Sequence, residues 1–145
     1  MKQEQSQVAI ELHMWIEDNG QVEETTTKAT GYLYNRNKMD VLTYHEQLEN
    51  SGDTIKNLLT IQREKVSIKR SGAVAMHQQF SPGETSETLF QHMHGAIHME
   101  TYTEEIVYQP PRRTKPGELS VAYQVKLNGQ DARRHQLTLT IQKAV

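Results

Sequence analysis

The sequence contains no cysteine, a single tryptophan and four prolines, and no apolar run that approaches the length of a membrane-spanning helix. Without cysteine the chain can form no disulfide framework and carry out no thiol chemistry. The first residues, Met1–Gln7, lack the apolar core of a secretory signal peptide. These absences predict a cytoplasmic protein that makes no contact with membranes.

The chain also carries little net charge. Its 16 Lys and Arg residues and 18 Asp and Glu residues give a formal charge of −2 at pH 7, and the two signs are interspersed. Proteins that bind nucleic acid or anionic lipid usually present a concentrated positive surface. Neither partner is therefore expected, and we interpret the small basic groups at Arg112–Lys115 and Arg133–Arg134 as solvated surface.

Large apolar side chains are scarce, since Leu, Ile, Val and Phe together make up about a fifth of the 145 residues. A fraction this low is also found in disordered chains, but those usually combine it with a high net charge. A chain of this length can bury a core of its own. We predict one ordered domain, residues 1–145.

What the sequence does contain is regular alternation of apolar and polar residues. Val8–Ile16 and Leu119–Leu127 alternate with a period of two, which is typical of half-buried strands. Asp18-Asn19-Gly20 and Asn128-Gly129 are turn signals, because their residues tolerate positive φ. The segment Ile55–Ile61 fits either a strand or one face of a helix.

Nine or ten short strands with tight connections predict an all-β fold. Consecutive antiparallel strands form a meander, and closure into a barrel removes the two edges that a meander would expose. We therefore predict a closed antiparallel meander barrel of about 8–10 strands. A two-layer sandwich is the alternative.

A spaced set of turn glycines and strand residues extends over most of the chain and is densest between Arg70 and Thr101. The set is Arg70-Ser71-Gly72-x-Val74-x-Met76-x-Gln78-x-Phe80, then Gly83, Gly95 and Thr101, then Tyr123 and Gly129. It resembles the YwiB-like proteins, a small bacterial family of unknown function with a calycin-like, lipocalin-like β-barrel. The resemblance implies a single closed barrel in the bacterial cytoplasm, and it supplies no catalytic residues.

Polar and aromatic residues on the inward faces of such a barrel could line a small-molecule pocket, or they could simply fill the interior. Arg70 shares its strand face with Val66 and Ile68. It therefore either reaches water at the barrel end or anchors an anionic ligand inside. We predict a site for a small, partly apolar molecule. Its expected lining residues are Arg70, Met76, Gln78 and Tyr123.

Three histidines, His92, His94 and His98, lie close together in the sequence. Residues two apart on a strand point the same way, so His92 and His94 could share a zinc ion, with His98 returned to them by a turn at Gly95. The alternative is that all three are exposed on a solvated strand face. Apart from this possible zinc, no cofactor is expected.

Catalysis has little support, because the sequence has no phosphate-binding loop, nucleophile elbow or HExxH motif. The second hypothesis is a protein-interaction or structural module, in which a filled barrel supports loops such as Pro110–Gly117. A metal-dependent enzyme at His92, His94 and His98 is the third hypothesis and is less favoured than the other two.

Overall fold

The computed structural model describes residues 5–48 and 52–144, so the start of the N-terminal stretch discussed above lies outside the described residues. Within them the ambiguous segment is a strand, Thr54–Ile61, and no helix is long and apolar enough to cross a membrane. The strands are β1 (Gln5–Asp18), β2 (Gln21–Arg36), β3 (Met39–Gln47), β4 (Thr54–Ile61), β5 (Val66–Gly72), β6 (Met76–Phe80), β7 (Thr85–His92), β8 (Gly95–Gln109), β9 (Gly117–Leu127) and β10 (Arg133–Lys143).

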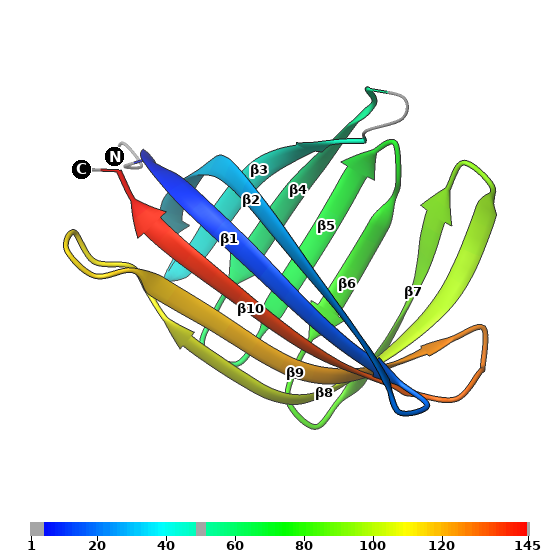
Figure 1. The fold of residues 1–145 in the computed structure, drawn as a ribbon. Coiled ribbons are helices and arrows are strands. Elements are labelled where there is room, and N and C mark those ends of the chain that lie inside the picture. Colours follow the sequence, from blue (N-terminus) through cyan, green and yellow to red (C-terminus); the bar gives the residue numbers. More distant parts are fainter. Residues whose placement is uncertain (1–4, 49–51, 145) are drawn as a thin grey trace.

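All these strands belong to one antiparallel sheet with the order β6-β5-β4-β3-β2-β1-β10-β9-β8-β7. Neighbours in the sheet are neighbours in the chain, except that β1 pairs with β10, from Val8↔Lys143 to Glu17↔Arg134. Figure 1 shows the sheet curving round on itself, with the start of β1 beside the end of β10. The predicted all-β meander barrel is confirmed.

The barrel is nearly closed, and its seam lies between the edge strands β6 and β7. In the described part of the chain, one backbone pair bridges the seam: Ala75, the residue before β6, and Gln91 on β7 exchange N–H···O bonds of 2.9 and 2.8 Å. Further along the seam, Gln78 Nε2 donates to Thr101 Oγ1 on β8 at 2.9 Å. The ring is therefore held at the seam by a few bonds instead of a full ladder.

Tight turns set the register of several neighbouring strands. Asn19-Gly20 and Asn37-Lys38 each connect two strands, and all four residues have positive φ, between 51° and 79°. Asn128 and Gly129, the strongest hairpin signal in the sequence, also have positive φ, at 51° and 73°. Turns of this type match the right-handed twist of antiparallel strands.

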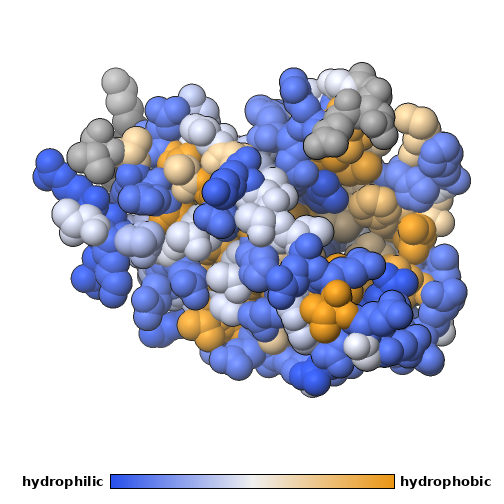
Figure 2. Space-filling model, in the orientation of Figure 1, coloured by the Kyte–Doolittle hydropathy of each residue, from blue (hydrophilic) through white to orange (hydrophobic). Residues whose placement is uncertain are grey.

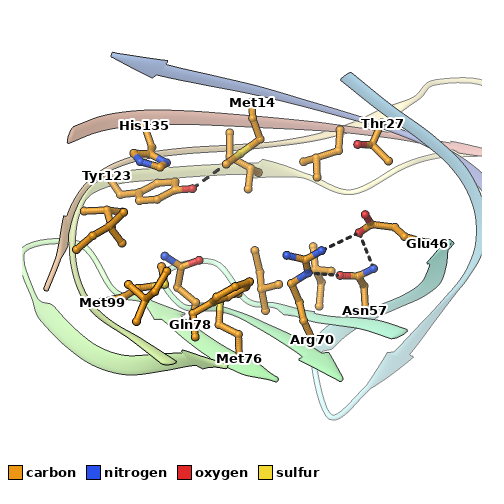
Figure 3. A pocket seen from close by; sticks show the side chains of 18 of the residues that line it. Met14, Thr27, Glu46, Asn57, Arg70, Met76, Gln78, Met99, Tyr123 and His135 are labelled. Carbon is orange, nitrogen blue, oxygen red and sulfur yellow. Dashed lines mark hydrogen bonds and ion pairs between the residues drawn. The ribbon is translucent and has the colours of Figure 1, made fainter. Parts of the chain in front are cut away.

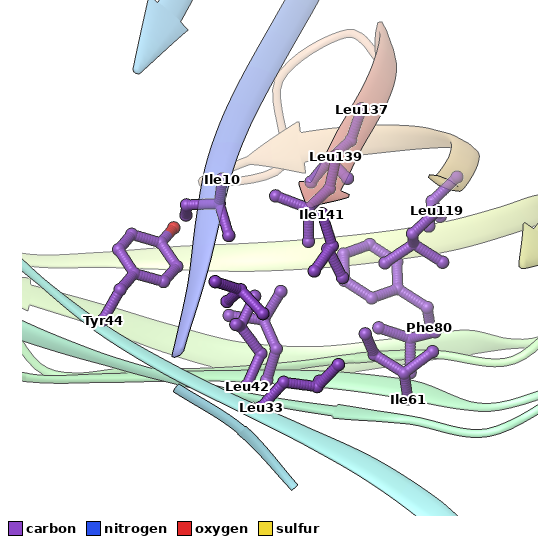
Figure 4. Close-up of a cluster of buried hydrophobic side chains, with 14 of the residues drawn as sticks. Ile10, Leu33, Leu42, Tyr44, Ile61, Phe80, Leu119, Leu137, Leu139 and Ile141 are labelled. Carbon is purple, nitrogen blue, oxygen red and sulfur yellow. The ribbon is translucent and has the colours of Figure 1, made fainter. Parts of the chain in front are cut away.

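One end of the barrel is filled by apolar side chains that meet from opposite walls (Figure 4). These residues are Val8, Ile10, Leu33, Leu42, Ile61, Val66, Phe80, Leu119, Val121, Leu139 and Ile141. The Tyr108 hydroxyl on β8 donates to Asp40 Oδ2 on β3 at 2.6 Å. Burial, and then this bond to Asp40, raise the pKa of Tyr108. We call this half of the barrel the packed end.

Candidate functional site

The other half of the barrel holds a cavity of about 390 Å³ that is partly open to solvent. Most of its lining is aliphatic or aromatic, and its polar groups come from strands on both sides (Figure 3). The polar residues are Thr27, Tyr44, Glu46, Asn57, Arg70, Gln78, Tyr123 and His135.

The cavity is lined by the same inward rows of side chains that fill the packed end. On β10, Ile141 and Leu139 are buried in the packed end, whereas Leu137 and His135 line the cavity. On β6, Phe80 belongs to the packed end and Gln78 to the cavity wall. Side chains on a strand alternate between its two faces, so every second residue of each strand points into the barrel, in the packed end and along the cavity alike.

The structure brings all of the predicted lining residues to this one cavity. They are Arg70, Met76, Gln78 and Tyr123. Among the other aromatic residues on strands, Tyr44 and Phe90 also line it. In contrast, Tyr32 and Tyr102 are 47% and 42% exposed and lie outside the lining. The four predicted lining residues thus lie on one side of the wall, whereas the aromatic residues on strands divide between the two faces of the sheet.

Arg70, Asn57 and Glu46 form a polar network on the wall made by β3, β4 and β5 (Figure 3). Arg70 and Asn57 are cross-strand partners, and Arg70 Nε donates to Asn57 Oδ1 at 3.2 Å. Asn57 Nδ2 donates to Glu46 Oε1 at 2.8 Å, and Arg70 Nη2 lies 3.5 Å from the same oxygen. Arg70 is therefore neither an isolated buried cation nor a residue extended alone into water.

Two tyrosines contribute neutral hydroxyl groups to the cavity wall. Burial, and then the negative charge of Glu46, raise the pKa of Tyr44 to about 12, while Arg70 opposes this change. Burial also raises the pKa of Tyr123, whose hydroxyl contacts Met14 Sδ at 3.9 Å. Because sulfur is a weak acceptor, the Tyr123 hydroxyl has no strong partner in this contact.

His135 is the least satisfied polar residue of the cavity wall. Its ring lies against that of Tyr123, tilted by 35° at a centroid distance of 4.9 Å, and both ring nitrogens are buried without a hydrogen-bond partner. Burial, and then the positive charge of Arg133, lower the pKa of His135 to about 4, so the ring is neutral at pH 7. A buried polar group without a partner costs about 1–3 kcal/mol.

The sequence contained a signal for the polar residues that were missed, although it was weak. Asn57 stands between Ile55 and Leu59 on the inward face of β4, and His135 lies two residues before Leu137 on β10. Each is a polar residue in phase with the buried apolar residues of its strand. Such positions face the interior, and an interior that is fully packed rarely contains them.

The three histidines of the predicted zinc site lie around the β7–β8 turn. His94 donates its backbone N–H to His92 Nδ1 at 3.1 Å, whereas His98 Nε2 lies 4.0 Å from Glu87 Oε2. Within residues 5–48 and 52–144, no group of three or more His, Asp or Glu side chains is arranged to hold a metal ion. The zinc site stays a prediction that metal analysis of the purified protein would test.

A ten-stranded antiparallel barrel with one packed and one hollow half defines a small β-barrel protein with an internal cavity. The chain belongs to the family of the domain of unknown function DUF1934, whose model matches residues 10–139. It is 28% identical over 140 residues to the uncharacterised β-barrel protein YwiB of Bacillus subtilis strain 168, covering 97% of this chain and 95% of that protein.

The fold agrees with a solved structure of the same relative. The crystal structure of the B. subtilis ywiB protein superimposes with a TM-score of 0.86 at 24% identity, covering 99% of this chain and 96% of that one. The resemblance to the YwiB-like proteins is confirmed. Neither the family description nor the relative's name states an activity, so function has to be inferred from the cavity.

Proposed function

We propose that this protein is a calycin-like, lipocalin-like barrel that binds a small, partly apolar molecule in the cavity of its hollow half. A cytoplasmic location, which the cysteine-free sequence favours, is part of the proposal. The lining residues Arg70, Met76, Gln78 and Tyr123 would contact the ligand. The volume of about 390 Å³ lies at the lower end of the range of small-molecule pockets.

The observation that carries the proposal is the contrast between the two halves of one barrel. Protein interiors are normally packed as densely as organic crystals, and the apolar side chains of the packed end are almost completely buried. The same strands leave the other half hollow and line it with polar groups, including the unpartnered His135. Both features lower stability, and both are useful to a binding site.

A neutral fluorescent probe tests the proposal directly. N-phenyl-1-naphthylamine, which fluoresces strongly only in apolar surroundings, is expected to bind the purified protein with a stoichiometry of one. Met76→Trp places a large ring in the cavity and is expected to weaken probe binding about tenfold or more. The measurement is a fluorescence titration, with circular dichroism to establish that the variant is folded.

Met93→Trp is the matched control, because Met93 lies in the β7–β8 turn and is 75% exposed. It introduces the same ring outside the cavity and is expected to leave the titration unchanged. If the wild-type protein does not bind the probe, or if both variants bind it equally well, the interior of the barrel is not the binding site and the proposal is wrong.

A further inference from the structure

We infer that the ligand's polar head is an uncharged group that both donates and accepts hydrogen bonds, such as a primary amide, and not a carboxylate or an ammonium. This inference rests on the proposed function and specifies the class of ligand. It comes from the network of Arg70, Asn57 and Glu46, which we call the Arg–Asn–Glu network.

The charges of the Arg–Asn–Glu network cancel. Arg70 carries one positive charge and Glu46 one negative charge, and their closest atoms are 3.5 Å apart. A ligand carboxylate attracted by Arg70 would also be repelled by Glu46. A ligand ammonium attracted by Glu46 would likewise be repelled by Arg70. Asn57, only 1% exposed, bonds to both partners and holds them together.

The network keeps both a free hydrogen-bond donor and a free acceptor. Its bonds use Arg70 Nε and Nη2, Glu46 Oε1 and both polar ends of Asn57. In the described part of the chain, no side-chain hydrogen bond or ion pair involves Arg70 Nη1 or Glu46 Oε2. Arg70 can therefore donate to a ligand oxygen while Glu46 accepts from a ligand N–H, which is the pairing that an amide offers.

The rest of the cavity also disfavours a charged head. Apolar groups predominate in its lining, and an ion transferred from water into such surroundings loses hydration that only a dedicated counter-charge restores. The nearby titratable groups are neutral at pH 7: Tyr44 has a pKa of about 12, and His135 one of about 4. In the described lining the only full charges are therefore those of Arg70 and Glu46.

Three unbranched compounds with eight carbon atoms each and different heads test the inference. Octanamide, octanoate and octylamine are short enough for the cavity, and each would compete with N-phenyl-1-naphthylamine at pH 7. We expect octanamide to displace the probe at a concentration about tenfold lower than either charged analogue. Equal or stronger displacement by octanoate or octylamine would overturn the inference, while leaving probe binding, and thus the proposed function, intact.

A single substitution should reverse the preference. Glu46→Gln removes the negative charge, leaves Arg70 uncompensated, and is expected to strengthen octanoate binding about tenfold relative to octanamide. Glu118→Gln, on the exposed outer face of β9, makes the same chemical change away from the cavity and should leave the order of the three compounds unchanged. If Glu46→Gln binds the probe but keeps the wild-type order, the Arg–Asn–Glu network does not select the head group.

Discussion

Replacing Phe80 by alanine is expected to lower the free energy of unfolding by about 4 kcal/mol, whereas Phe90→Ala is expected to cost only about 1 kcal/mol. These are the only phenylalanines in the chain. Phe80 is fully buried in the packed end and meets the edge of the Tyr123 ring at a centroid distance of 4.8 Å. Phe90 is half-buried and lines the cavity.

The difference follows from what surrounds each ring. Removal of Phe80 opens a new void among side chains that are closely packed on all sides, so both burial and contacts are lost. Phe90 already borders open space and loses fewer contacts. Urea denaturation followed by circular dichroism gives both values. Similar costs for the two variants would mean that the two halves of the barrel are equally packed, contrary to the structure.

His135→Leu is expected to stabilise the protein by about 1–2 kcal/mol at pH 7. Leucine has a similar size and has no polar atoms, so the penalty for two buried ring nitrogens without partners disappears. His77→Leu, at an exposed position of β6, is the control and should change stability by less than about 0.5 kcal/mol. A loss of stability in His135→Leu would show that the imidazole is satisfied after all.

His135→Leu should also remove a pH dependence of the free energy of unfolding. The ordinary histidine pKa of 6.5 applies to the unfolded chain, while burial lowers the pKa of His135 to about 4 in the folded one. Between these values the unfolded state binds more protons, so stability falls as the pH decreases. The full difference between these two pKa values corresponds to about 3 kcal/mol in the free energy of unfolding. Because the ring borders the cavity and is only partly shielded from solvent, we expect an effect of about 2 kcal/mol.

Denaturation curves recorded from pH 7 to pH 4.5 measure this effect. The wild-type protein should lose about 2 kcal/mol more than His135→Leu over that range. The advantage of the variant therefore grows as the solution becomes more acidic. Parallel curves for the two proteins would contradict a depressed pKa at His135.

Much of the fold could be predicted from local patterns. The alternation in Val8–Ile16 and Leu119–Leu127 predicted strands, and the Asn-Gly pairs predicted turns with positive φ. Both depend only on a few consecutive residues, because strand periodicity and turn conformation are properties of the local backbone. Ile55–Ile61 was ambiguous, since its apolar spacing suits two periodicities, and pairing with β3 and β5 made it a strand.

Part of the candidate site was also predictable. Arg70, Met76, Gln78 and Tyr123 were selected from the alternation within their own strands, and all four line the cavity. The partners of Arg70 could not be identified in this way. Glu46 lies on β3 and Asn57 on β4, and only the register of these strands with β5 brings their side chains to Arg70.

The sequence by itself determined that this chain forms antiparallel strands with one apolar face each, because that property repeats every second residue. Only the tertiary structure decided that β1 meets β10, that the seam falls between β6 and β7, and that one half of the barrel stays hollow. These features depend on how inward rows from opposite walls meet across the barrel. The volume that remains between such rows is a property of the whole ring, which no single strand encodes.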